Sequence, residues 1–188
     1  MTAGASNPEN QCLYAQEAFS FLESEGFSVI RESSPASFML TYSSASHPIS
    51  VLVNALLPRY EYGVSISRDA QRMALDEMAS VLDASGGEDV GWTWAHSDPE
   101  VFRAHISYSA KLLRRHWPHL LKRFHETFSL VADARSKAAE LEHVRQLSRA
   151  AEDAFAAGRW AEASTAYRAL STLTQLQKKR KEIADRHG

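Results

Sequence analysis

The chain has 188 residues, 44% of them hydrophobic and 23% charged, which is typical of a globular protein with a packed core. Its single cysteine, Cys12, excludes an internal disulfide framework and a metal site built from several cysteines. No stretch approaches the length of a membrane span and the first residues do not resemble a signal peptide, so we expect a cytoplasmic protein without a membrane partner.

The net charge of -2 hides a strong asymmetry along the chain. Residues 1–100 hold 14 acidic and four basic residues, residues 101–125 hold six basic and no acidic residues, and residues 126–188 have a net charge of +2. Such an asymmetry indicates either a surface that attracts an oppositely charged partner, or an acidic part and a basic helix that balance each other within one fold.

The first 85 residues predict a helix, four strands and a second helix. Ser6 to Glu9 is typical of a helix start, and Gly26 ends that helix. From Phe27 to Ile66, apolar residues alternate with polar ones in four runs separated by short turns, which predicts a four-stranded antiparallel meander with one apolar face. A second helix is expected from Ser67 to about Ala84.

The segment from Glu88 to His96 contains two aromatic residues, Trp92 and Trp94, which either cap the core or form a platform for a ligand. Acidic residues lie in or beside this segment, and they either cap helices or carry out acid–base chemistry. They are Glu88, Asp89, Asp98 and Glu100. We assign no catalytic residue, and the enzyme alternative is a small hydrolase with a site near residues 92–100.

The stretch from Val101 to His125 predicts an amphipathic helix. At 100° per residue, its large apolar residues fall on one narrow stripe and its basic residues fall away from it. The stripe comprises Phe102, Ile106, Leu113, Trp117, Leu120 and Phe124. The basic residues, Arg103, Lys111, Arg114, Arg115, Lys122 and Arg123, are candidate partner-binding residues together with Trp92 and Trp94. Pro118 predicts a break or kink at His116 to Pro118.

Three histidines, His116, His119 and His125, lie close together in this stretch. Metal ligands must face one point, but Pro118 interrupts the first pair, and His119 and His125 point about 120° apart on a helix. We therefore expect neither a metal site nor a cofactor. Cys12 has no neighbouring base, so we expect a small buried hydrophobe and not a nucleophile.

The C-terminal residues Ala151, Phe155, Gly158, Trp160, Ala163, Tyr167 and Leu170 resemble one tetratricopeptide-type helical hairpin. The resemblance covers about 30 residues and implies two helices that meet at small residues, with the turn at Gly158. It departs from the family pattern at Leu170 and Gln175. A single unit lacks the roughly three repeats that build a peptide-binding groove. We expect a last helix from Trp160 to about His187, with Lys178 to Lys181 near its end.

Together these patterns predict an α+β fold with a first part at residues 1–96 and a helical extension at 97–188 packed on it as one globule. The helix–meander–helix unit is similar to small bacterial proteins of unknown function and to some toxin-immunity proteins. We expect a non-enzymatic protein–protein interaction module, with an immunity-like or adaptor role in which the acidic first part binds a basic partner. The alternative is a nucleic-acid-binding protein that uses the basic helix 101–125.

Overall fold

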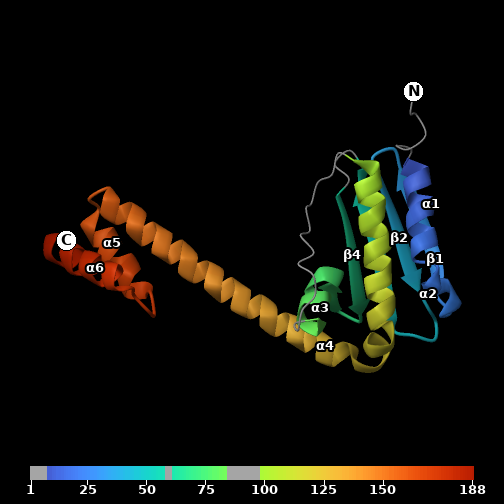
Figure 1. Cartoon of the computed structure of the whole chain (residues 1–188). Coiled ribbons are helices and arrows are strands. Elements are labelled where there is room, and N and C mark those ends of the chain that lie inside the picture. The colour runs from blue at the N-terminus through green and yellow to red at the C-terminus, as the bar shows by residue number, and fades with distance from the viewer. Residues whose placement is uncertain (1–7, 58–60, 84–97) are drawn as a thin grey trace. The chain divides into compact units, whose positions relative to one another are not determined.

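The computed structural model describes residues 8–57, 61–83 and 98–188, and it confirms the α+β class (Figure 1). The elements in chain order are α1 (Pro8–Ala18), α2 (Phe21–Ser24), β1 (Ser28–Ser34), β2 (Ser37–Ser43), β3 (Ile49–Leu56), β4 (Glu61–Arg68), β5 (Gln71–Ala74), α3 (Leu75–Leu82), α4 (Pro99–Ala156), α5 (Trp160–Ala169) and α6 (Gln175–His187). None of the helices in these residues is both long and apolar enough to cross a membrane.

The chain forms two compact units, residues 1–132 and 133–188, which we call the sheet unit and the C-terminal unit. The division lies within α4 and not at residue 96, where the sequence analysis had placed it. The reason is that α4 contributes buried residues as far as Val131 to the core that also holds the sheet. The whole basic helix region, residues 101–125, is therefore part of the sheet unit.

The sheet is an antiparallel meander in the order β1-β2-β3-β4-β5. The four predicted strands are confirmed, but the helix predicted from Ser67 was wrong at its start, because Gln71 to Ala74 form a fifth strand. Arg68 pairs with Gln71, so the turn has two residues, and Asp69 adopts the positive φ of 54° that such tight turns require. Met73 of β5 is fully buried and pairs with Ile66 of β4, so β5 contributes to the buried, apolar face of the sheet.

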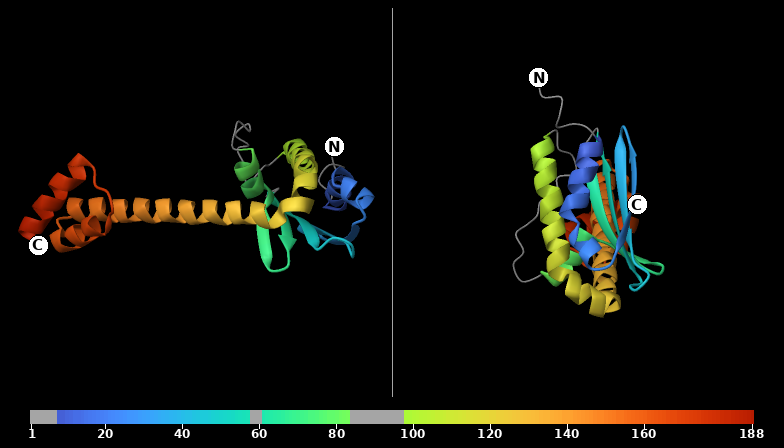
Figure 2. Two further views of the ribbon diagram at one scale, coloured as in Figure 1. Left: turned by 90° about the horizontal axis from the view of Figure 1, so that it is seen from below. Right: turned by 90° about the vertical axis from the view of Figure 1, so that its right-hand side faces the viewer.

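Helices α1 and α3 and the first part of α4 cover one face of the sheet (Figure 2). The side chains on this inner face alternate with those on the outer face, as strand geometry requires. Those buried on the inner face are Phe38, Leu40, Tyr42, Ile49, Val51, Val53, Ala55, Val64, Ile66 and Met73. No described helix packs on the outer face (Figure 2). By the strand register, this face carries many serines together with apolar and charged side chains.

Helix α4 contradicts the predicted position of the break. It continues through Pro118, and its one residue with non-helical angles is Arg123, with φ -133° and ψ 34°. Pro118 itself is exposed, whereas Trp117 and Leu120 on either side are buried in the core. Packing of these two side chains holds the helix together where the proline removes one backbone hydrogen bond.

The C-terminal unit contains the end of α4 together with α5 and α6. As the hairpin prediction required, α4 ends at Ala156, Gly158 adopts a φ of 70°, and α5 begins at Trp160. The predicted single helix to His187 was wrong, because residues 170–173 leave the helix and Thr174 caps α6 through Gln177. The small core holds Ala151, Ala154, Ala163, Tyr167, Leu170 and Ala184.

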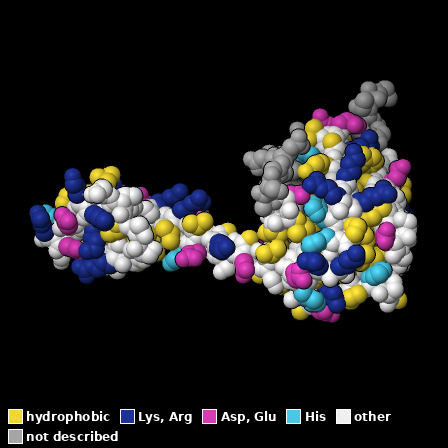
Figure 3. All heavy atoms as spheres, turned by 60° about the horizontal axis from the view of Figure 1, so that its bottom comes forward, with side chains coloured by type: hydrophobic (Ala, Val, Ile, Leu, Met, Phe, Trp, Pro, Cys, Tyr) yellow, Lys and Arg dark blue, Asp and Glu magenta, His cyan; other side chains and the backbone are white. Residues whose placement is uncertain are grey.

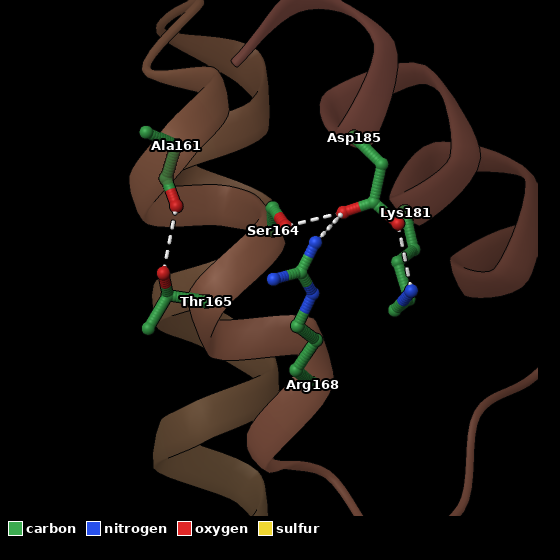
Figure 4. A network of polar contacts seen from close by, with 6 residues as sticks. All are labelled: Ala161, Ser164, Thr165, Arg168, Lys181 and Asp185. Carbon is green, nitrogen blue, oxygen red and sulfur yellow. Dashed lines mark hydrogen bonds and ion pairs between the residues drawn. The ribbon is translucent and has the colours of Figure 1, made fainter.

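One polar network joins α5 to α6 around Asp185 (Figure 4). The Asp185 carboxylate accepts hydrogen bonds from the Ser164 hydroxyl, from the Arg168 guanidinium at 2.8 Å and from the Lys181 ammonium at 2.7 Å. The bonds from Lys181, Ser164 and Arg168 hold the pKa of Asp185 well below its ordinary value. Lys181 therefore lies in the middle of α6 and pairs with Asp185, and not near the helix end where the sequence predicted it.

Because the folded state lowers the pKa of Asp185, its carboxylate stabilises the C-terminal unit above its unfolded pKa of about 3.9. This contribution is lost as the pH falls through the lower, folded pKa. Asp185→Asn is therefore expected to weaken the unit at pH 5 to 7, and its difference from the wild type is expected to shrink steadily as the pH falls from about 4 to about 2. The amide NMR signals of α5 and α6, followed across this range, measure the effect. The exposed Asp153→Asn is the control, and an equal effect there would contradict the assignment.

Candidate partner-binding surface

Burial of one side of α4 in the core determines which of its side chains face the solvent. All six residues of the predicted apolar stripe are buried, with exposed fractions between 0% and 2%. Trp117 packs its ring edge-on against the rings of Phe21 and Phe27, with centroid distances of 6.3 and 5.3 Å. The amphipathic helix is therefore confirmed, and its basic residues lie on the part of α4 that points away from the core.

Three of the six basic residues have acidic partners within the sheet unit. Arg103 contacts the Glu100 carboxylate at 3.2 Å, Arg115 the Asp83 carboxylate at 2.7 Å and Arg123 the Glu126 carboxylate at 3.3 Å. Asp83, at the end of α3, also lies 3.1 Å from Nε2 of His116. The internal balance between the acidic part and the basic helix is thus realised for Arg103 and Arg115, whereas Arg123 pairs with an acidic residue further along α4.

The other three basic residues, Lys111, Arg114 and Lys122, are exposed, and we call them the cationic stripe. Within the described part of the chain none of them forms an ion pair, and Arg114 places its guanidinium over the ring of Phe21 at 5.9 Å. At 100° per residue the three directions lie within about 80° of one another, and eleven residues of helix span about 16 Å. Figure 3 shows basic side chains beside histidines on this unit.

The histidines of α4 do not converge on one point. His116 contacts Asp83, and Nδ1 of His125 lies 2.8 Å from Oε1 of Gln71 in β5. Residues 8–57, 61–83 and 98–188 contain no group of three or more His, Cys, Asp or Glu side chains that could hold a metal ion. The two histidines instead fasten α4 to α3 and to β5.

Of the acidic candidates near the start of α4, Asp98 caps the helix: its Oδ1 accepts a hydrogen bond from the backbone N–H of Glu100 at 2.8 Å. Glu100 pairs with Arg103 as described above. Trp92, Trp94, Glu88 and Asp89 lie outside the described residues, so their roles stay predictions.

Two side chains of the sheet unit that could ionise, the buried Cys12 and the partly buried Tyr62, have structural roles. Cys12 is fully buried, and burial raises the pKa of its thiol, so the reactive thiolate is disfavoured. Burial also raises the pKa of Tyr62, although its hydrogen bond with Ser109 acts in the opposite direction. The Tyr62 hydroxyl donates to the backbone oxygen of His105 at 2.6 Å and so ties β4 to α4.

Sequence reasoning missed two features of the surface. Asp83 is one, because a helix-ending acid gives no sign that it will meet residues 32 and 33 positions later. The other is the outer face of the sheet, where Ile30 and Leu56 are 58% and 51% exposed. The signal for Ile30 was present in the sequence, because it follows Val29 directly and must therefore point to the opposite face.

Comparisons of the chain with protein-family models, with curated proteins and with solved structures found no match.

Proposed function

We propose that the protein is a non-enzymatic protein–protein interaction module whose cationic stripe binds an acidic surface of a partner protein. The observation that supports this is the division among the basic residues of α4. Arg103, Arg115 and Arg123 have acidic partners within the unit, whereas Lys111, Arg114 and Lys122 project from the same helix without one among the described residues. Exposed charges of one sign steer a partner of the opposite sign and set its orientation.

The size and surroundings of the stripe favour a protein over a nucleic acid. The sheet unit carries 15 acidic and ten basic residues, a net charge of -5. A polyanion that extends beyond three cations would meet this net negative charge, whereas a compact acidic patch about 16 Å long would not. An adaptor or immunity-like role is compatible with such a contact, and the acidic remainder of the unit leaves room for a basic partner elsewhere.

The proposal is tested by fluorescence anisotropy with a labelled glutamate-rich peptide and a labelled single-stranded oligonucleotide, each at low and at physiological salt. The wild type is expected to bind the peptide with a salt-dependent affinity. The triple variant Lys111→Gln, Arg114→Gln, Lys122→Gln is expected to weaken that binding at least about tenfold, because three charges that meet the peptide are removed.

The matched control is Lys178→Gln, Lys179→Gln, Arg186→Gln, which removes three exposed charges from α6. It is expected to keep the wild-type affinity. Equal weakening in both triple variants would indicate a general charge effect and contradict the proposal. Tighter, steeply salt-dependent binding of the oligonucleotide would replace the proposal with the nucleic-acid alternative.

A further inference from the structure

Strand β1 is an open edge of the sheet. Among the described residues its only neighbouring strand is β2 (Figure 2), and six of its seven residues are exposed to solvent. One row of its backbone N–H and C=O groups therefore has no strand to pair with, which is the arrangement to which an extended peptide adds. The opposite edge, β5, is only four residues long and leads directly into α3.

On the outer face of β1, an exposed apolar side chain is followed by an acidic one. Ile30 is 58% exposed, and Glu32 follows two residues later on the same face. In the described part of the chain, the Glu32 carboxylate has no hydrogen bond and no ion pair. Natural edge strands carry charged residues that discourage pairing, but here an apolar side chain stands next to a single unbalanced acid.

A hollow of about 390 Å³ adjoins Glu32 on the sheet. Its other lining residues include Ser34, Met39, Asn54 and Leu56 from β1, β2 and β3, and none of its lining residues is basic. Leu56 is 51% exposed and faces Glu61 of β4 in the sheet register. The hollow thus offers apolar walls, four uncharged polar side chains and a net negative charge.

We propose that an extended segment of a partner protein adds to β1 as a sixth strand and places a basic side chain against Glu32. In a strand, alternate side chains share a face, so the segment would carry an apolar residue beside Ile30 and a lysine or arginine two positions away. The stem of the basic side chain would lie along the outer face beside Ile30 while its charge meets the Glu32 carboxylate on the neighbouring strand.

This site goes beyond the proposed function, because it lies on the sheet, has the opposite charge and uses backbone pairing instead of a helix surface. Pairing of β1 with β1 of a second copy is less favourable. The antiparallel register that pairs all seven residues places two copies of Arg31 directly opposite each other, and like charges in that position are destabilising.

The test uses two labelled peptides of seven residues, the length of β1. In one, valine and lysine alternate with threonine; in the other, glutamate replaces lysine. The wild type is expected to bind the lysine peptide and not the glutamate peptide. Glu32→Lys is expected to reverse this preference, with a loss of at least about tenfold for the lysine peptide, since a like charge then faces it.

Two further variants and one further measurement separate the edge from general effects. Glu17→Lys makes the same charge change on α1 and is expected to leave both affinities unchanged. Ile30→Ser is expected to weaken binding of the lysine peptide, while the protein still prefers it to the glutamate peptide. Hydrogen exchange should slow in β1 when the lysine peptide binds, and not in α4.

The proposal is overturned by any of three results: no binding of the lysine peptide to the wild type, equal effects of Glu32→Lys and Glu17→Lys, or protection outside β1. Sedimentation that shows the protein alone to be a dimer broken by Glu32→Lys would assign the edge to a second copy instead. The glutamate-rich peptide of the preceding test reports on α4 alone. The two tests are therefore independent, and failure of one proposal does not decide the other.

Discussion

Replacement of Tyr167 by alanine is expected to unfold the C-terminal unit while the sheet unit stays folded. Tyr167 is fully buried, and its hydroxyl donates a hydrogen bond to Oε1 of Glu152 at 2.9 Å. Removal of a large buried aromatic side chain costs about 3–5 kcal/mol. A core as small as this one supplies about the same amount in total, because few of its residues are large and buried.

Hydrogen exchange measured by mass spectrometry separates the two units. In Tyr167→Ala, the amides of α5 and α6 should lose protection, while those of β3 keep it. Tyr167→Phe is the matched control, because it keeps the ring and removes only the hydroxyl, at a cost of about 1 kcal/mol. Protected α5 and α6 in the alanine variant, or an equal loss in β3, would contradict the presence of two separate cores.

The parts of the fold that the sequence predicted well are those with a long, regular alternation. The apolar stripe from Phe102 to Phe124 identified the buried side of α4, because its large apolar residues recur three, four or seven positions apart. The inner faces of β2, β3 and β4 followed from the period of two in the same way. Such patterns can be interpreted without knowing which distant residues pack nearby, because the spacing of apolar residues within one element identifies its buried face.

The parts that failed are governed by short local geometry or by tertiary packing. The turn at Asp69 and Ala70 lacks the glycine that usually announces a tight hairpin, so β5 looked like the first turn of a helix. Pro118 predicted a break from local chemistry, but the burial of Trp117 and Leu120 outweighs it. In both cases contacts made by distant elements decide the backbone.

The candidate surface shows the same limit. The sequence placed six basic residues outside the core, and the described structure agrees, but it could not divide them into paired and unpaired residues. That division depends on partners such as Asp83, which reaches Arg115 across 32 positions of sequence. The open backbone groups beside Glu32 likewise require the strand order, because only an edge strand leaves its backbone groups unpaired.

Replacement of Trp117 by alanine is expected to destabilise the sheet unit by about 3–5 kcal/mol, since it removes the largest side chain at the contact between α4, α2 and the start of the sheet. The indole is 2% exposed and meets the rings of Phe21 and Phe27 edge-on, a geometry that adds to the loss. Urea unfolding followed by circular dichroism measures the free energy, and hydrogen exchange in β3 and α5 assigns the loss to one unit.

Trp117→Phe is the control, and it is expected to cost less than half as much, because the phenyl ring keeps most of the apolar contact. The indole Nε1 has no hydrogen-bond partner among the described residues, so its removal breaks no bond.

The alanine variant also tests why α4 continues through Pro118. If packing of Trp117 holds the helix there, the amides from Leu112 to Trp117 should exchange faster in the alanine variant than in the phenylalanine variant. Equal exchange in both variants would show that the helix tolerates the proline without that packing.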